Sequence, residues 1–341
     1  MNYKLHQIQL ENNKVFKIAH GARKYADTLI LEINIDGITA FGEGAHVPYY
    51  GISTEQTKEL LSAHLSEIIS FWNTEPAVFW PKINQLLGSN HYAKCIVDMA
   101  HYDWLSQKAG VPLASYIGSD VHNVPLSSFT IGIDSIENMI SELKKSSFPI
   151  IKVKLGTSED DKIIDALLAE TNKTIRVDVN AGWDRTHAIE WANRFFAQGI
   201  EFLEQPFPKD DLESTAWLKE QVRIPIIADE SVFDLKDVVK CAAAFHGINI
   251  KLTKCGGIYP ALLMIQKAKE LGLKTMLGCM TESSIGISAL AHMAALVDYI
   301  DMDGATLIKN DPAEGVQIVA GKAIFKECNG HSGRLKIVVN E

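Results

Sequence analysis

The sequence predicts an α/β fold in which a parallel strand–helix barrel follows a smaller α+β region. The main observation is a rhythm that begins near residue 124, where short apolar segments alternate with helical stretches. Strands are expected at SSFTIGI, IIKVKLG, TIRVDVN, IEFLEQP, IPIIADE, INIKLTK, TMLGCM and YIDMDGA. Eight strands with regular helical crossovers favour a closed barrel. A doubly wound open sheet is the alternative, although no G-x-G-x-x-G segment supports a dinucleotide-binding fold.

The first 120 residues carry a different mixture of strand and helix signals. The segment YKLHQIQL alternates apolar and polar residues, and TLILEINIDGITAFGEG indicates two strands around the turn Asp36-Gly37. Helical patterns follow in STEQTKELLSAHLSEIISFW and AKCIVDMAHYDWLSQKAG. We therefore expect an α+β domain over residues 1–120 and a barrel domain over residues 121–310. Residues 311–341 read as strands again and are expected to return to the amino-terminal domain.

The composition is that of a globular protein with an acidic balance. The 341 residues are 47% hydrophobic and 22% charged, with a net charge of −9 and no cluster of Lys and Arg longer than a pair, which argues against a nucleic-acid partner. The five cysteines are widely spaced and form no C-x-x-C pair, which argues against a disulfide framework or a zinc site. Since neither a signal-peptide pattern nor an apolar run of membrane-spanning length is present, we expect a cytoplasmic protein without membrane contact.

Three acidic residues lie near the carboxyl ends of successive predicted strands. They are Asp178 in IRVDVN, Glu204 in EFLEQP and Asp229 in IIADES, about one strand–helix unit apart. The carboxyl ends of barrel strands meet at one mouth, where barrel enzymes carry their sites. Converging carboxylates repel one another unless a cation joins them, and an all-oxygen ligand set suits Mg²⁺, with Mn²⁺ as a second possibility. The alternative is that each acid caps a helix or pairs with a surface lysine.

Lysines on two other strands complete a pattern for proton transfer. Lys152 and Lys154 lie on the strand before Asp178, and Lys251 lies on the strand after Asp229. Because these are the second and sixth of eight strands, their lysines are expected to face each other across the mouth. One lysine could then remove a proton from a carbon acid and the other return it on the opposite face, with Mg²⁺ binding the substrate carboxylate. Nearby positive charge and partial burial are expected to lower the pKa of a catalytic lysine towards neutrality. The alternative is that the lysines are structural counter-ions.

The strand that carries Lys251 contains further polar residues. Alternation predicts that Asn249, Lys251 and Thr253 share one face. Lys254 is out of phase with Lys251 and is expected to be exposed to solvent.

These motifs together resemble the enolase superfamily, in its muconate-lactonizing enzyme subgroup. The segments KVK, DVN, EQP, ADES and NIKLTKCGG carry the resemblance. It implies a (β/α)7β TIM-like barrel under an α+β capping domain. By position, it implies that Asp178, Glu204 and Asp229 are metal ligands, that Lys154 and Lys251 are the acid/base pair, and that Lys152 is an accessory lysine.

The eighth strand narrows the reaction. Asp301 and Asp303 alternate in YIDMDGA and so lie on one face, where they could bind a free ammonium group. This D-x-D resembles that of dipeptide epimerases, in which it binds the amino terminus of the dipeptide. The seventh strand, LGCMTESS, has no histidine, which disfavours a histidine-based racemase or sugar-acid dehydratase. The alternative reading of the aspartates is an acidic strand end with a salt-bridge role.

The substrate side chain is the least determined feature. Arg23 lies in AHGARKYADT, which resembles the loop before the second family strand, and matches an arginine that contacts the acidic side chain in Ala-Glu epimerases; a solvated surface arginine is the alternative. Thr281 is expected to contact the substrate, Tyr49 and Tyr50 to reshape the pocket, and Glu282 either to alter its charge preference or to pair with a barrel lysine.

We therefore expect a Mg²⁺-dependent epimerase of dipeptides, with L-Ala-D/L-Glu, as in murein peptide recycling, as the favoured substrate. Epimerases of hydrophobic or cationic dipeptides, an o-succinylbenzoate synthase, an N-acylamino acid racemase and a non-catalytic barrel are the alternatives. Family habit makes a homo-oligomer plausible.

Overall fold

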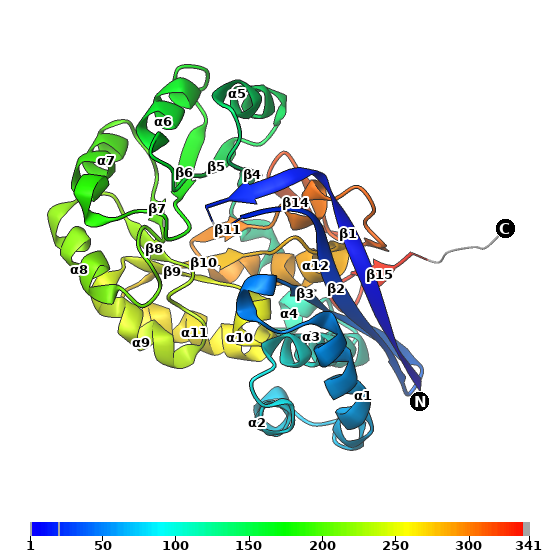
Figure 1. Cartoon of the computed structure of the whole chain (residues 1–341). Coiled ribbons are helices and arrows are strands. Elements are labelled where there is room, and N and C mark those ends of the chain that lie inside the picture. Colours follow the sequence, from blue (N-terminus) through cyan, green and yellow to red (C-terminus); the bar gives the residue numbers. More distant parts are fainter. Residues whose placement is uncertain (1, 20, 337–341) are drawn as a thin grey trace.

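The amino-terminal domain is built on a three-stranded antiparallel sheet. A computed structural model describes residues 2–19 and 21–336 of the chain (Figure 1). The sheet has the order β1 (Asn2–Ile18), β2 (Gly21–Ile35) and β3 (Ile38–His46). Asp36 and Gly37 both have positive φ, 53° and 80°, which is the geometry of a type I′ hairpin turn. The strand pair predicted around this turn is confirmed.

Helices cover one face of this sheet. They are α1 (Thr54–Ser70), α2 (Pro76–Leu87) and α3 (His91–Lys108). The short helices η1 (Pro48–Tyr50), α4 (Leu113–Tyr116) and η2 (Val121–Asn123) lie in the segments before α1 and after α3. Helix α3 lies against β3, where a Cβ atom at Gly42 would stand 1.9 Å from the Ile96 carbonyl oxygen. Only glycine therefore allows the helix and the strand to approach this closely.

The carboxy-terminal two thirds of the chain form a parallel eight-stranded barrel, as predicted. The strands are β4 (Phe129–Ile131), β5 (Ile150–Lys154), β6 (Thr174–Asp178), β7 (Leu203–Glu204), β8 (Ile226–Ala228), β9 (Gly247–Ile250), β10 (Lys274–Gly278) and β11 (Tyr299–Asp301), hydrogen-bonded in that order. A parallel bridge between Ser127 and Ile300 joins the first strand region to the last. The sheet is therefore closed, and the alternative of a doubly wound open sheet is wrong.

The barrel helices form an outer layer around the strands (Figure 1). They are α5 (Ile136–Lys145), α6 (Asp160–Leu168), α7 (Arg185–Ala197), α8 (Leu212–Gln221), α9 (Leu235–Ala244), α10 (Leu252–Cys255), α11 (Ile258–Glu270) and α12 (Ser284–Met293), followed by η3 (Ala294–Leu296). Each of the first seven strands is followed by an α-helix, with α10 and α11 both following β9, whereas after β11 the chain continues into η4 (Gly304–Leu307). This is the (β/α)7β arrangement.

Strand β5 shows how the barrel directs polar side chains inward. Ile151 and Val153 are fully buried in the core that the strands share with the outer helices. Lys152 and Lys154 alternate with them and line the cavity at the barrel mouth. In the strand register, Lys154 pairs with Asp178, and Asp178 pairs with Glu204. Three ionisable residues therefore lie side by side at the ends of adjacent strands.

The last segment pairs with itself and contacts the amino-terminal domain. Strands β12 (Ala313–Glu314) and β15 (Arg334–Leu335) form one small sheet, and β13 (Gln317–Val319) and β14 (Lys322–Ile324) form another. Arg334 Nη1 and the His331 backbone N–H donate hydrogen bonds of 3.0 and 2.9 Å to the buried Asp103 carboxylate on α3. The return predicted for residues 311–341 thus reaches α3, and residues 337–341 of that range lie outside the described residues.

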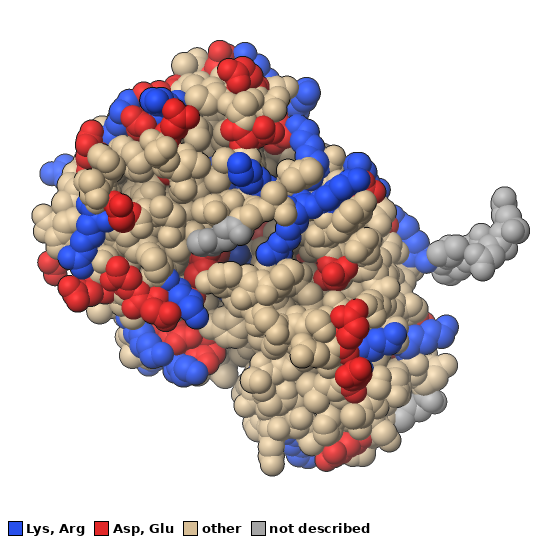
Figure 2. Space-filling view, in the orientation of Figure 1, with Lys and Arg blue, Asp and Glu red and all other residues tan. Residues whose placement is uncertain are grey.

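The cysteines and the apolar helices bear on two further expectations. All five cysteines are free thiols, in line with the absence of a disulfide framework. Within residues 2–19 and 21–336, no helix is both long and apolar enough to cross a membrane. On the face shown in Figure 2, positive and negative side chains are interspersed.

A buried aspartate connects the two domains. Asp98 on α3 is fully buried, and its Oδ2 atom accepts a 3.0 Å hydrogen bond from the Tyr259 N–H in the first turn of α11. A Cβ atom at Gly257 would lie 2.4 Å from the same oxygen. The other oxygen, Oδ1, has no hydrogen-bond partner among the described residues. Burial raises the pKa of Asp98 to about 7, although the hydrogen bonds that its carboxylate accepts from backbone N–H groups act to lower the pKa.

The raised pKa predicts how this aspartate affects stability. Below the unfolded-state pKa near 3.8, the Asp98 carboxyl group is protonated in both the folded and the unfolded protein, so its burial carries no ionisation penalty. As the pH rises towards 7, ionisation favours the unfolded state. Relative to an Asp98→Asn variant, the wild-type free energy of unfolding should fall by roughly 2–3 kcal/mol between about pH 5 and pH 8.

Urea denaturation of both proteins at several pH values measures this difference. Asp210→Asn, at an exposed site, is the matched control and should show no such trend. A wild-type-to-variant difference that stays constant with pH would contradict the assignment.

Candidate active site

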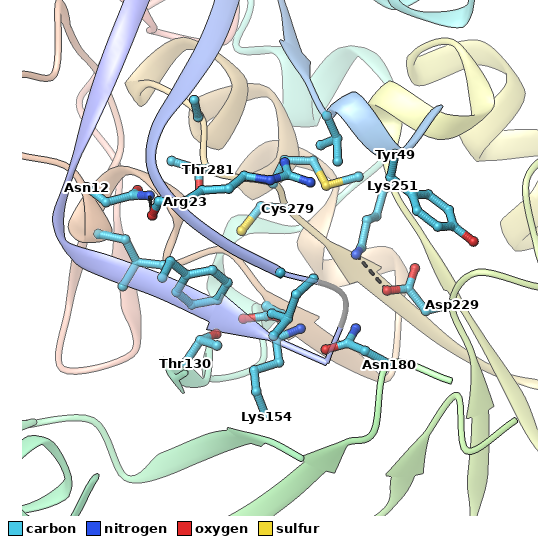
Figure 3. A pocket seen from close by; sticks show the side chains of 18 of the residues that line it. Asn12, Arg23, Tyr49, Thr130, Lys154, Asn180, Asp229, Lys251, Cys279 and Thr281 are labelled. Atoms are coloured by element: carbon cyan, nitrogen blue, oxygen red, sulfur yellow. Dashed lines mark hydrogen bonds and ion pairs between the residues drawn. The ribbon is translucent and has the colours of Figure 1, made fainter. Parts of the chain in front are cut away.

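A cavity of about 410 Å³ lies between the two domains at the carboxyl ends of the barrel strands (Figure 3). The amino-terminal domain contributes residues from β1, β2 and the segment that follows β3. The predicted site residues that line the cavity are Arg23, Lys152, Lys154, Asp229, Lys251, Thr281, Asp301 and Asp303. The remaining two, Asp178 and Glu204, are fully buried and contact Lys152. Folding thus brings all ten predicted residues into one region.

The three predicted metal ligands form a compact cluster. Asp178 and Glu204 are the last residues of β6 and β7, and Asp229 directly follows β8. One carboxylate oxygen from each lies within 4.8 Å of the others. Three carboxylate oxygens that converge in this way are the all-oxygen donor set that Mg²⁺ prefers. The donor set and its geometry therefore fit a hard divalent cation.

Neighbouring polar groups orient these carboxylates. The Asn180 N–H donates to Asp178 Oδ1 at 3.0 Å, and Asn249 Nδ2 donates to Glu204 Oε1 at 2.8 Å. The Asp229 N–H donates to the Gln205 side-chain oxygen at 2.9 Å. These hydrogen bonds orient the carboxylates of Asp178 and Glu204 and fix the backbone at Asp229, as supporting hydrogen bonds do in metal sites.

Lys152 is the central cation of the cluster. Its side chain is 1% exposed, and its Nζ atom lies 3.0 Å from Asp178 Oδ2, 2.9 Å from Glu204 Oε2 and 3.1 Å from Asp301 Oδ2. Burial would lower the pKa of Lys152, but these carboxylates outweigh burial and raise the pKa well above its ordinary value. Lys152 is therefore a permanent ammonium group that holds the acids together.

The same balance determines which acids stay ionised. Burial opposes ionisation of Asp178, yet Lys154 and Lys152 lower its pKa to about 2. Asp229 is likewise buried, and Lys251 and Lys254 hold its pKa well below the ordinary value. For Glu204, burial and the charge of Asp178 prevail and raise the pKa to about 7. Without a bound cation, the cluster therefore keeps one carboxyl group that protonates easily.

The two predicted proton-transfer lysines stand on opposite sides of the mouth. Lys154 ends β5, and Lys251 follows β9, four strands away in the sheet order. Lys154 Nζ lies 2.6 Å from Asp178 Oδ2, and Lys251 Nζ lies 2.7 Å from Asp229 Oδ2 (Figure 3). Burial lowers the pKa of Lys251, but Asp229 outweighs it, so the net pKa is raised. The expected lowering is therefore wrong for Lys251 in the chain without metal, because an unneutralised carboxylate is its direct partner.

Two expectations about the segment after β9 are wrong. The strand ends at Ile250 and the chain turns into the short helix α10, so Thr253 does not continue an alternating strand face. Lys254 is 1% exposed rather than solvated. Its Nζ atom donates to Asp229 Oδ1 at 2.5 Å, to the Asp229 carbonyl at 2.7 Å and to the Asn249 carbonyl at 3.3 Å. Lys254 is thus a second cation on a predicted metal ligand.

The helical turn explains this placement. One turn of helix brings residues three positions apart to the same side, so Lys254 joins Lys251 at Asp229. Gly256 and Gly257, with φ of 98° and 137°, follow α10. This glycine pair is the signal in the sequence that could have indicated a helix end rather than a continuing strand.

The aspartate pair of the eighth strand lies beside Lys152. Asp301 ends β11 and accepts a 3.2 Å hydrogen bond from Ser128 Oγ, while Asp303 Oδ2 accepts a 2.6 Å hydrogen bond from the Thr130 N–H. Burial opposes ionisation of Asp301, but Lys152 lowers its pKa, whereas burial and the charge of Asp301 raise the pKa of Asp303 to about 7. Both carboxyl groups line the cavity, so a second cation could share them.

The residues predicted to select the substrate side chain, other than Glu282, line the cavity. Arg23 belongs to strand β2 rather than to a loop, and Figure 3 shows its guanidinium group directed into the cavity. Thr281, Tyr49 and Tyr50 also line the cavity. Burial lowers the pKa of Arg23. No hydrogen bond or ion pair joins its side chain to another described residue, so its donors are available to a ligand.

Glu282 follows neither expectation. It is buried and is not among the cavity-lining residues, and no ion pair with a lysine forms within the described ranges. Instead it lies beside Gly286 and Glu43, where burial and the Glu43 charge raise the pKa of its carboxyl group well above the ordinary value.

Two cavity residues that the sequence interpretation did not assign are Glu230 and Asn180. Asn180 Nδ2 donates to Glu230 Oε1 at 3.3 Å. Burial and the charges of Asp229 and Asp178 raise the pKa of Glu230 to about 7. Both residues stand next to the predicted ligands in the motifs DVN and ADES, which was the available signal.

Comparison with known proteins agrees with this geometry. Residues 6–118 match the family described as mandelate racemase / muconate lactonizing enzyme, N-terminal domain, and residues 135–330 match the enolase C-terminal domain-like family. The chain is 40% identical to an L-Ala-D/L-amino acid epimerase of Flavobacterium johnsoniae, over 96% of this chain and 97% of that protein. It is 35% identical to an L-Ala-D/L-Glu epimerase of Bacteroides thetaiotaomicron, over 94% and 85% respectively.

A solved structure extends the similarity to the whole fold. The dipeptide epimerase of Enterococcus faecalis, complexed with Mg and the dipeptide L-Leu-L-Tyr, superposes with a TM-score of 0.91. The two sequences are 30% identical, and the match covers 97% of this chain and 98% of that chain. The acidic cluster, the closed barrel and these matches together show that the chain belongs to the enolase superfamily, in its mandelate racemase / muconate lactonizing enzyme family.

Proposed function

We propose that this chain is a Mg²⁺-dependent dipeptide epimerase that inverts the Cα of the carboxy-terminal residue, with L-Ala-D/L-Glu as its preferred substrate. The observation that carries the proposal is a buried carboxylate trio with a lysine on each side and an aspartate pair at the carboxyl end of β11. The relatives named above act on dipeptides of this kind, and one of them was solved with Mg and a dipeptide.

The residue roles follow from the arrangement. Asp178, Glu204 and Asp229 would hold the metal, with Mn²⁺ as an alternative ion. When bound there, Mg²⁺ would supply positive charge next to the substrate carboxylate as the α-proton leaves. Lys154 and Lys251 lie on opposite sides, so one takes the α-proton and the other delivers a proton to the opposite face. The electron pair of the broken C–H bond moves into the adjoining carboxylate during the exchange. Lys152 adds fixed positive charge to the same region.

The amino end of the dipeptide would bind Asp301 and Asp303. A free ammonium group pairs with carboxylates in a dry cavity through short, charge-assisted hydrogen bonds. O-succinylbenzoate-type substrates carry no ammonium group and would gain no ion pair from these aspartates.

Arg23 would contact the side chain of the residue that is inverted. Its guanidinium group points into the cavity and keeps donors that no described residue occupies. A glutamate carboxylate matches the paired donors of a guanidinium group better than an apolar side chain does. Thr281 would complete this part of the pocket.

We also propose a source for the substrate, a cellular location, an oligomeric state and a division into domains. An L-Ala-D/L-Glu substrate would come from murein peptides, and a cytoplasmic homo-oligomer would suit their recycling. We assign residues 1–120, with the return 311–341, to the capping domain and residues 121–310 to the barrel. The cap then supplies specificity residues and the barrel supplies the chemistry.

Isotope exchange tests the reaction. In D₂O with Mg²⁺, the wild-type protein should place deuterium on Cα of the carboxy-terminal residue of L-Ala-L-Glu and form the epimer. Lys154→Ala and Lys251→Ala should each slow inversion by about 10²–10⁴-fold, because inversion needs both lysines. Each variant should still exchange one of the two epimers, and the two variants should retain opposite epimers.

NMR of both starting epimers measures the outcome. Lys209→Ala, at an exposed position, is the control and should match the wild type. Loss of exchange from the same epimer in both lysine variants would contradict the two-sided arrangement.

Acetylation tests the aspartate pair. N-acetyl-L-Ala-L-Glu should lose at least about 100-fold in kcat/KM relative to L-Ala-L-Glu, because it lacks the ammonium group that Asp301 and Asp303 would bind. Comparable turnover of both compounds would instead favour an N-acylamino acid racemase.

Substitution of Arg23 tests the glutamate preference. Arg23→Met should lower kcat/KM for L-Ala-L-Glu at least about tenfold while changing L-Ala-L-Val much less, because only the former loses a charge-assisted hydrogen bond. Arg23→Lys keeps the charge and should lose less. Equal losses for both dipeptides would argue against contact with the glutamate carboxylate.

A further inference from the structure

A second cavity of about 350 Å³ adjoins the active site. It lies between the end of β1, the segment that joins β4 to α5, the residues after α5, and η4. Its volume is within the range of small-molecule sites. The residues that line both cavities are Asn12, Phe16, Thr130 and Leu307. The second cavity therefore borders the first along these four residues.

The junction of the two cavities lies at the aspartate pair. The Thr130 N–H donates the 2.6 Å hydrogen bond to Asp303 Oδ2, and Thr130 itself lines both spaces. A substrate ammonium group on Asp303 would place its own carbon close to this junction. The peptide carbonyl on that carbon must run towards the carboxylate cluster, so the side chain is the substituent left to enter the second cavity.

The lining of the second cavity is mainly apolar. Its apolar members are Val15, Phe16, Phe129, Ile133, Phe148 and Leu307. The rings of Phe129 and Phe148 pack with their centroids 5.5 Å apart. An apolar or aromatic group would gain contact area against these side chains.

The charged members are two lysines, Lys14 and Lys145, and two acids, Asp134 and Glu142, so their formal charges cancel. Lys14 and Glu142 form an ion pair with each other. Asp134 Oδ1 accepts hydrogen bonds from the Ser135 N–H and from Asn138 Nδ2. No strong net charge thus remains to select a charged ligand side chain.

Asn12 adds a polar group at the junction. It is 4% exposed, and its Nδ2 atom donates to the Arg23 carbonyl at 3.2 Å. Its Oδ1 atom has no hydrogen-bond partner among the described residues. This oxygen is an acceptor available to an N–H group of a ligand that passes between the cavities.

We propose that the second cavity binds the side chain of the amino-terminal residue of the dipeptide, and that it accepts a large apolar or aromatic side chain there. The inference rests on the proposed function, because the orientation of the substrate depends on an ammonium group at Asp303. The enzyme is then broader at the amino-terminal position than an alanine-specific epimerase.

Two pairs of dipeptides test this subsite. We would measure kcat/KM for Cα exchange with L-Phe-L-Glu and L-Ala-L-Glu, and with L-Phe-L-Val and L-Ala-L-Val. The ratio of Phe to Ala within a pair reports only the amino-terminal side chain. In the wild type this ratio should be above about one tenth in whichever pair is processed.

Variants that fill the second cavity from two sides give the decisive comparison. Ser147→Trp and Val15→Trp, at residues that line only this cavity, should each lower the Phe-to-Ala ratio at least about tenfold. Ser147→Ala and Val15→Ala are the matched controls and should keep the wild-type ratio.

The outcomes separate the two proposals. A ratio that both filling variants leave unchanged, or a wild type that exchanges alanine dipeptides and rejects both phenylalanine dipeptides, overturns the subsite and leaves the epimerase proposal intact. If only the two valine dipeptides exchange, the glutamate preference is overturned. The Phe-to-Ala ratio of the valine pair then still tests the subsite. No exchange with any of the four dipeptides overturns both.

Discussion

The structure depends on charge compensation between buried lysines and buried carboxylates at the barrel mouth. Lys152 alone contacts three acids, and Lys251 and Lys254 share Asp229. Removing either kind of charge would leave the other unpaired in a dry site, which costs several kcal/mol. The acids therefore remain together without metal only because ammonium groups occupy positions beside the oxygens that a divalent cation would also use.

This compensation links folding with function. The same ammonium groups that stabilise the acids stand where a substrate carbon would need an acid and a base, so their structural role is compatible with the proton transfer proposed for them. The barrel holds this chemistry on the rigid ends of β5 to β9, while the cap extends β1 and β2 over the mouth and adds Arg23 and Asn12 (Figure 1). Side-chain selection can thus change in the cap or in η4 without disturbing the charged cluster.

Much of this arrangement could be predicted because it depends on local periodicity. Alternation in β5 places Ile151 and Val153 outward and Lys152 and Lys154 inward, and the repeat of strand and helix places Asp178, Glu204 and Asp229 at one mouth. The same reasoning failed at Lys254, because a two-residue period was applied past Ile250, where the backbone has already become helical. In the chain without metal, the pKa of Lys251 is raised rather than lowered, since the direct contact with Asp229 outweighs burial.

By itself, the sequence determined the closed α/β barrel, the acidic cluster and the lysines that flank it, because each follows from the spacing of residues along the chain. Only the tertiary structure decided that Lys254 is a buried partner of Asp229, that Arg23 points into the cavity from β2, and that a second apolar cavity opens beside Asp303. These features arise where segments far apart in the sequence meet. Residues near positions 12, 130 and 307 share no local pattern, so their contact exists only after the cap has packed on the barrel.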